Sequence, residues 1–265
     1  MTRILLVGCG KMGGALLDGW LDLGLSPQDV VVIDPQEAAR RSRSQVRVEA
    51  DLSALPAGFR PDVVVLAVKP QMMDAALPPY AVFTDVVFLT IAAGKPLAYF
   101  AAKLGSDRPV VRAMPNTPAA VRRGMAVVVA NANVTAAQKE TCGKLLSAVA
   151  EIAWIDDESL MDAVTAVSGS GPAYVFLLAE VLANAGVAAG LPRELADRLA
   201  RVTVTGSGEL LRQSPESPAT LRQNVTSPGG TTFAALQVLM RDNGIGPLMT
   251  EAIAAAARRS RELAG

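Results

Sequence analysis

The chain has 265 residues, of which 51% are hydrophobic, and a mean hydropathy of +0.31, enough for a folded core in one domain or two modest ones. Its 25 basic and 25 acidic residues cancel and only 4% of residues are aromatic, so we expect no nucleic-acid partner. The chain contains no histidine and its two cysteines have no metal-ligand spacing, so histidine catalysis is excluded and no metal site is predicted.

Aliphatic runs alternate with helical stretches in the first half of the chain. A helix begins near Gly13, after the first run, and Gly24 suits its end. Continuous apolar runs predict buried strands at residues 4–7, 30–33, 63–68, 86–91, 109–113 and 125–130. This alternation predicts an α/β fold, a Rossmann domain with a doubly wound parallel sheet, over residues 1–157.

The second half, residues 158–265, has helical spacing and no strand-like run. Helices are predicted at residues 174–189, 194–211, 231–240 and 247–263. Their shortage of charge indicates that a second copy covers part of them, so we expect an all-helical C-terminal dimerisation domain. Glu180 and Asn184 share a face of the first helix, where they either line a site or pair with each other.

No segment suggests export or a membrane. Lys11 interrupts the N-terminal apolar stretch too early for a signal peptide. The densest apolar stretch of the second half ends at Glu180, short of the roughly 18 apolar residues of a membrane span. Together with Cys9 and Cys142, expected to be reduced thiols, this predicts a cytoplasmic protein without a membrane partner.

A Gly-x-Gly-x-x-Gly motif lies between the first strand and its helix. Gly8 allows the tight turn, Gly10 lets the backbone approach a pyrophosphate, and Gly13 lets helix pack on strand. Asp34 ends the next strand, about 20 residues after the motif, as dinucleotide-binding sequences require. A carboxylate there favours NADH, whereas Arg40 and Arg41 either bind the 2′-phosphate of NADPH or form a solvated helix face.

Three further strand ends are candidates for cofactor contact, because ligands of open α/β sheets bind at the carboxyl ends of strands. Lys69 either contacts a cofactor ribose or phosphate or is an ordinary surface lysine. The small residues Ala92 and Ala93 allow a ring to approach closely. Asn116 and Thr117 either orient nicotinamide or substrate or only fix the turn. The predicted cofactor-binding residues are Gly8, Gly10, Lys11, Met12, Gly13, Asp34, Ala67, Val68, Lys69, Pro70, Ala92, Ala93, Met114 and Asn116.

A second loop, residues 225–232, combines a Pro-Gly-Gly turn with four hydroxyl side chains. Such a segment presents backbone N–H and O–H donors to a small anion such as a carboxylate. The chain therefore pairs a dinucleotide loop with an anion loop, which indicates two ligands brought together.

Five segments in order, residues 8–13, 67–70, 114–118, 168–174 and 226–232, resemble pyrroline-5-carboxylate reductase. The resemblance covers nearly the whole chain. It implies NAD(P)H-dependent reduction of 1-pyrroline-5-carboxylate to L-proline, the last step of proline biosynthesis, in a homodimer or a larger ring of dimers. It also implies a catalytic Thr232 near the ring nitrogen and substrate-binding residues Ser170, Val225, Thr226, Ser227, Gly229, Gly230, Thr231 and Thr232.

Two alternative interpretations fit the sequence less well. A hydroxyacid dehydrogenase with a helical second domain needs a catalytic lysine there, but no lysine follows Lys144. A non-catalytic dinucleotide sensor needs no second loop, and residues 225–232 are intact.

Overall fold

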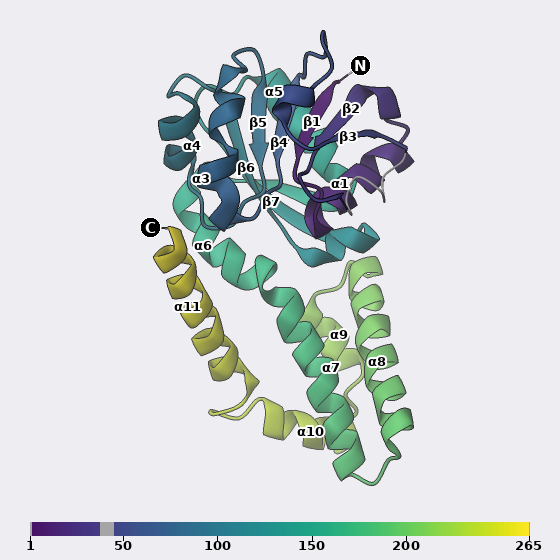
Figure 1. Cartoon of the computed structure of the whole chain (residues 1–265). Coiled ribbons are helices and arrows are strands. Elements are labelled where there is room, and N and C mark those ends of the chain that lie inside the picture. The colour runs from purple at the N-terminus through teal and green to yellow at the C-terminus, as the bar shows by residue number, and fades with distance from the viewer. Residues whose placement is uncertain (1, 38–44, 265) are drawn as a thin grey trace. The chain divides into compact units, whose positions relative to one another are not determined.

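A computed structural model describes residues 2–37 and 45–264, which fall into two compact units (Figure 1). The first comprises Met1–Gly169 with Ala257–Gly265, and the second comprises Ser170–Ala256. The first unit thus extends past residue 157, the predicted end of the Rossmann domain. The extension has a physical basis, because Met161 packs with Val127 and Val129, and the Ser260 hydroxyl donates to the Asp162 carboxylate at 2.6 Å.

The first unit is built on an eight-stranded sheet in the order β3-β2-β1-β4-β5-β6-β7-β8. All strands from β3 to β6 in this order are parallel. The strands are β1 (Ile4–Val7), β2 (Val30–Ile33), β3 (Arg47–Glu49), β4 (Val63–Leu66), β5 (Val87–Thr90), β6 (Val110–Pro115), β7 (Gly124–Ala130) and β8 (Ala150–Trp154). The reversal between β1 and β4 gives the doubly wound order that the sequence predicts.

Helices cover both faces of this sheet (Figure 1). The helices α1 (Lys11–Asp22) and α5 (Ala136–Ser147) pack on one face, in a core that includes Ile4 and Leu6. The helices α3 (Met73–Ala76) and α4 (Leu97–Leu104) pack on the other, in a core that includes Leu5 and Val7. Side chains that alternate along a strand therefore enter opposite cores, which explains why the central strands are apolar throughout.

Two features of the sheet differ from the sequence-based prediction. The strand β7 runs antiparallel to β6, because the short link through the 3₁₀ turn Thr117–Val121 cannot make the crossover that a parallel pair needs. The edge strands β3 and β8 were not predicted. Both are short and carry exposed polar residues, so neither has the continuous apolar run of the buried strands.

The second unit is helical, as predicted. It contains α7 (Gly171–Ala188), α8 (Arg193–Gln213), the unpredicted short α9 (Pro218–Asn224), α10 (Thr231–Leu239) and the start of α11 (Ile245–Ala264). The helices α7 and α8 pack together as a hairpin (Figure 1). Asn184 Oδ1 accepts a hydrogen bond from the guanidinium of Arg193 of α8 at 3.0 Å, which joins the two helices of the hairpin.

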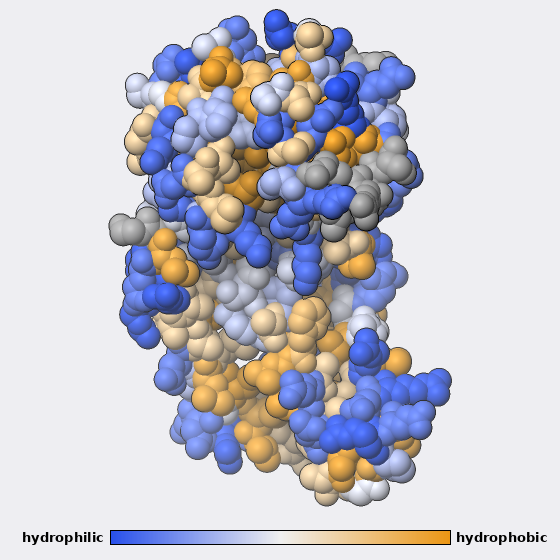
Figure 2. Space-filling view, in the orientation of Figure 1, coloured by the Kyte–Doolittle hydropathy of each residue, from blue (hydrophilic) through white to orange (hydrophobic). Residues whose placement is uncertain are grey.

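This unit buries very little apolar surface of its own. Among its residues, only the alanines at 183, 196 and 200 are buried hydrophobic side chains. Larger apolar residues are exposed to solvent: Phe176 is 67% exposed and Val202 is 60% exposed. Apolar patches are correspondingly visible over the helices in the space-filling view of Figure 2. Three buried alanines are too small a core to stabilise a folded domain alone.

Candidate active site

The glycine-rich loop has the geometry that a dinucleotide requires. Gly8 has a φ of +89°, and a side chain there would press on the Ala67 carbonyl oxygen at 2.9 Å. A Cβ on Gly13 would overlap the carbonyl oxygen of Gly8, whereas a Cβ on Gly10 would meet no protein atom within 4 Å. Each glycine thus has the backbone setting that the motif requires.

The same loop places the start of α1 where an anion binds. Gly10 is the N-cap of α1, and no side chain caps the helix. The first-turn N–H groups of such a helix and its positive dipole end favour a pyrophosphate. Lys11 is exposed and Met12 is half-buried at this helix start. These residues fit a bound dinucleotide.

Asp34 lies beside this loop, at the end of β2. Its carboxylate accepts hydrogen bonds from the backbone N–H of Cys9 at 2.7 Å and of Gln36 at 2.9 Å. The side chain is buried, with 6% of the residue exposed. Arg40 and Arg41, the rival 2′-phosphate ligands, lie outside the described residues.

The ends of β4 and β5 lie at the same edge of the sheet as the glycine-rich loop. Ala67 and Val68 contact Gly8, while Lys69 is exposed at the start of the 3₁₀ turn Pro70–Met72. Ala92 is buried, and its N–H donates to the Thr90 hydroxyl at 3.2 Å. The structure therefore brings these predicted strand-end residues together at one edge of the sheet, at the carboxyl ends of its strands.

Asn116 has a structural role in the hairpin between β6 and β7. Its Oδ1 accepts from the N–H of Met125 at 2.9 Å, and its Nδ2 donates to the Ser168 hydroxyl at 3.3 Å. Met114 packs beside Gly169 in the π-helical turn Thr165–Gly169. Of the two roles considered for Asn116, the fixing of the turn is thus present in the structure.

One residue that supports the site was missed from the sequence. Glu158 Oε1 accepts from the guanidinium of the buried Arg112 at 2.7 Å and from the backbone N–H of Leu97 at 2.8 Å. Leu97 begins α4, four residues after Ala93. Glu158 therefore fastens the β5–α4 loop to β6. Only the apolar setting of Arg112 hinted at a buried partner.

The predicted substrate loop lies in the second unit, between α9 and α10. Gly229 has a φ of +68°, and Gly230 is the N-cap of α10, with no side-chain cap. Ser227 and Thr231 are exposed and Thr232 is half-buried. Uncapped N–H groups beside these hydroxyls form a cradle that suits a carboxylate.

Not every predicted substrate residue is available to a ligand. The Thr226 hydroxyl donates to the Arg222 carbonyl at 2.7 Å, so it closes the end of α9. Val225, which is 64% exposed, offers only its backbone to an anion. Ser170 stands at the N-cap of α7 without making a side-chain cap, which leaves its hydroxyl for another use.

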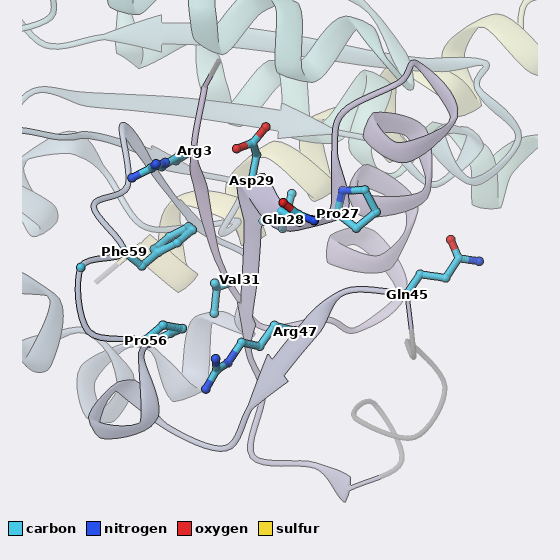
Figure 3. A pocket seen from close by; sticks show the side chains of 11 residues that line it. Arg3, Pro27, Gln28, Asp29, Val31, Gln45, Arg47, Pro56 and Phe59 are labelled. Atoms are coloured by element: carbon cyan, nitrogen blue, oxygen red, sulfur yellow. The ribbon is translucent and has the colours of Figure 1, made fainter.

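A surface hollow of about 520 Å³ lies elsewhere, at the amino ends of β1 and β2 (Figure 3). Arg3, Arg47 and Phe59 are among its lining residues. It is at the opposite end of these strands from the glycine-rich loop, and ligands of open α/β sheets bind at the carboxyl ends. This hollow is therefore not the candidate active site.

The cysteines differ sharply in their surroundings. Burial raises the pKa of the Cys142 thiol to about 12, so this residue stays protonated and unreactive at neutral pH. Cys9 is half-buried in the glycine-rich loop.

One finding departs from the expectation that no segment could span a membrane. Helical residues Glu158–Ala188 are long and apolar enough to do so by length and composition alone, with a window mean hydropathy of 1.4. The expectation concerned an unbroken run of apolar residues, whereas an 18-residue window can keep a high mean hydropathy although it contains a carboxylate. Only 11% of that window is buried, so these apolar side chains need a covering.

The nucleotide loop, doubly wound sheet and helical second unit define a dinucleotide-binding oxidoreductase. Residues 3–94 match the family model "NADP oxidoreductase coenzyme F420-dependent", and residues 158–263 match "Pyrroline-5-carboxylate reductase dimerisation". The pyrroline-5-carboxylate reductase of Pseudomonas aeruginosa is 45% identical over 99% of this chain and 97% of its own length. That of Synechocystis is 41% identical over 97% of each chain.

Solved structures agree with these relatives. A pyrroline-5-carboxylate reductase from Coxiella burnetii is 33% identical and superposes with a TM-score of 0.91, covering 99% of this chain and 98% of that one. The Plasmodium falciparum enzyme, solved with NADP bound, is 29% identical with a TM-score of 0.84, covering 100% and 98%. The chain belongs to the pyrroline-5-carboxylate reductase family.

Proposed function

We propose that this chain catalyses the NAD(P)H-dependent reduction of 1-pyrroline-5-carboxylate to L-proline, the last step of proline biosynthesis. The observation that carries the proposal is the uncapped start of α10 beside the hydroxyls of Ser227 and Thr231, in a chain with a complete dinucleotide loop. The sequence identity to reductases of this name, which extends over nearly the full length of the chain, supports the proposal. A sensor would need only the first loop.

The chemistry suits a chain without histidine. The bound dinucleotide supplies the hydride, and the protonated cyclic imine is already an electrophile at its C=N carbon. No strong general acid is needed, because the nitrogen keeps its proton when the carbon accepts the hydride. The protein's part is to position the substrate and the dinucleotide, which lowers the activation free energy by about 7–11 kcal/mol in favourable cases.

The residues of the second loop divide this positioning between them. The N–H groups at the start of α10 and the hydroxyls of Ser227 and Thr231 hold the substrate carboxylate. The Thr232 hydroxyl lies at the ring nitrogen and accepts a hydrogen bond from its N–H group, so the proton stays on the nitrogen. The small residues Gly229 and Gly230 let the backbone approach the carboxylate closely.

The Thr232 role can be tested with two matched variants. We expect Thr232→Ala to lower kcat/KM by about tenfold to a hundredfold, the value of one hydrogen bond to a charged group. Thr232→Ser keeps the hydroxyl and should retain most activity. Thr226→Ala serves as a control, because its hydroxyl binds Arg222 within the fold. An unchanged kcat and KM in Thr232→Ala would remove Thr232 from the mechanism.

We further propose that the enzyme acts as a homodimer or a ring of dimers through its helical unit, in the cytoplasm, with neither a nucleic-acid nor a membrane partner. The exposed apolar residues of α7 and the dimerisation family model over residues 158–263 support a second copy as their covering. Apolar residues occur all around α7, as expected of a helix enclosed by partners. Neither cysteine is in a disulfide, which agrees with a reducing compartment.

A further inference from the structure

We propose that two later segments of the chain hold the β5–α4 loop, residues 91–96, in the shape that admits the nicotinamide ring. The first contact is the Glu158 carboxylate, and the second is the last turn of α11, which Ser260 fastens. Glu158 and Ser260 are then positioning residues that act on the cofactor through the loop. The inference rests on the proposed function only in taking a reduced nicotinamide dinucleotide as the ligand.

The β5–α4 loop lies where the fold brings the nicotinamide half of a dinucleotide. A pyrophosphate binds at the glycine-rich loop, between β1 and β4, where the strand order reverses. The adenosine half lies on the β2 side of this point. The other half therefore extends over the carboxyl ends of β4 and β5, and the loop follows β5 directly.

The loop has few means of holding its own shape. Ala92, Ala93 and Gly94 have almost no side chain with which to pack. Gly94 has a φ of +70°, a conformation that costs glycine much of its entropy in the unfolded chain. The hydrogen bond from the Ala92 N–H to the Thr90 hydroxyl fixes only the start of the loop. The rest of the loop depends on its neighbours.

Glu158 fixes the far end of the loop. Its Oε1 accepts at 2.8 Å from the N–H of Leu97, the first residue of α4, whose N-cap Pro96 supplies no side-chain cap. The same oxygen accepts from the Arg112 guanidinium at 2.7 Å, and Arg112 is in register with Thr90, where β5 ends. A carboxylate at a helix start is favourable, and its bond to a guanidinium is a strong one. The pair therefore joins the two ends of the loop.

The last turn of α11 lies against the middle of the loop. Gly94 is buried, and a Cβ on it would lie 3.5 Å from the Leu263 carbonyl oxygen. One turn earlier the buried Ser260 hydroxyl donates to the Asp162 carboxylate at 2.6 Å. Asp162 follows Glu158 by four residues, so both contacts start from one short segment. All of these residues belong to the first compact unit.

A loosened loop should weaken only the part of the ligand that it touches. A ligand binds the fraction of the protein whose site has the competent shape, so its apparent affinity falls with that fraction. NADH and NADPH both carry the nicotinamide ring. ADP-ribose and its 2′-phosphate end before that ring, so their affinities should not depend on the loop.

Calorimetric titration of the full-length protein with these four ligands tests the inference. We expect Glu158→Ala and Ser260→Ala to weaken binding of the reduced dinucleotides at least about tenfold and binding of the two ADP-riboses less than about twofold. Glu158→Gln keeps an acceptor for the Leu97 N–H and should stay within about threefold of the unaltered protein. Glu140→Ala is the matched control, because Glu140 pairs only with Lys144 on the exposed face of α5, at 2.6 Å among the described ion pairs. Equal weakening of both ligand classes would overturn the inference.

A second variant covers a fault that Glu158→Ala introduces. Glu158→Ala leaves the buried Arg112 guanidinium without its carboxylate, which destabilises a fold by itself. The double variant Glu158→Ala with Arg112→Met removes both charges and still leaves the Leu97 N–H without this acceptor. We expect it to show the same selective loss of the reduced dinucleotides. Full affinity for them in both the double variant and Ser260→Ala would overturn the inference.

Amide hydrogen exchange of the ligand-free protein tests the loop directly. In Glu158→Ala the N–H of Leu97 loses its acceptor, so a peptide over residues 91–98 should exchange at least about tenfold faster. The same peptide should exchange faster in Ser260→Ala and at the unaltered rate in Glu140→Ala. An unchanged rate in both Glu158→Ala and Ser260→Ala would overturn the positioning role.

These measurements separate the inference from the proposed function. None of them contains a pyrroline carboxylate, so the selective loss of the reduced dinucleotides would stand even if turnover were absent. Conversely, a reductase that turns over substrate but binds NADH and NADPH equally well with and without the two contacts would keep the function and refute the role of Glu158 and Ser260.

Discussion

Replacing Gly13 with alanine is expected to destabilise the nucleotide-binding unit and to weaken dinucleotide binding. Alanine favours a helix interior over glycine by about 1 kcal/mol. The new Cβ, however, would overlap the carbonyl oxygen of Gly8, which is backbone and cannot turn away as a flexible side chain can. The destabilisation from this overlap should exceed the gain in helix propensity, so we expect the free energy of unfolding to fall by roughly 1–3 kcal/mol.

Gly10→Ala separates ligand binding from folding. Its Cβ would meet no protein atom within 4 Å, and its φ of −71° suits any residue. We expect the free energy of unfolding to change by less than about 1 kcal/mol and dinucleotide binding to weaken at least about tenfold. Chemical denaturation and fluorescence titration of both variants provide the measurements. Full stability in Gly13→Ala, or full affinity in Gly10→Ala, would contradict the described loop geometry.

The second large effect is expected at the apolar surface of α7. Phe176→Asp replaces a side chain that is 67% exposed in the single chain with a charge. If a second copy covers it, burial of a phenylalanine contributes about 1.5–3 kcal/mol at each of two symmetric positions. The dissociation constant of the dimer should therefore rise by more than about a hundredfold.

Sedimentation velocity over a range of protein concentrations measures this shift. Leu23→Asp is the matched control, because Leu23 is 68% exposed at the end of α1, in the other unit. We expect Leu23→Asp to keep the assembly of the unaltered protein and Phe176→Asp to dissociate. An unaltered protein that is monomeric at micromolar concentration, or that binds vesicles through α7, would contradict the proposed dimer.

The buried part of the fold could be predicted from the sequence because burial leaves a local signal. The strands β1 and β2 are buried on both faces, so each is a continuous aliphatic run with the predicted bounds. The edge strand β8 has only half-buried and exposed residues and carries Glu151, so no continuous apolar run marks it. The antiparallel direction of β7 depends on the short link before it, which strand patterns alone do not encode.

The candidate site, too, could be predicted from the sequence only in part. Motif spacing identified Gly8, Gly10 and Gly13, because each glycine answers a backbone requirement that is local in the chain. The contacts of Asp34 with Cys9 and of Glu158 with Arg112 join residues 25 and 46 positions apart, so only the fold reveals them. The hydroxyl of Thr226 also looked like a ligand group in sequence but closes a helix in the structure.

The most direct test of the proposed activity is an assay of the purified full-length protein with 1-pyrroline-5-carboxylate and NADH. Loss of the near-ultraviolet absorbance of the reduced nicotinamide is followed, and the product is identified by mass spectrometry. The proposed reductase should oxidise one NADH for each L-proline formed, and only when the substrate is present. Folded protein that binds NADH but forms no proline with either NADH or NADPH would contradict the proposed function.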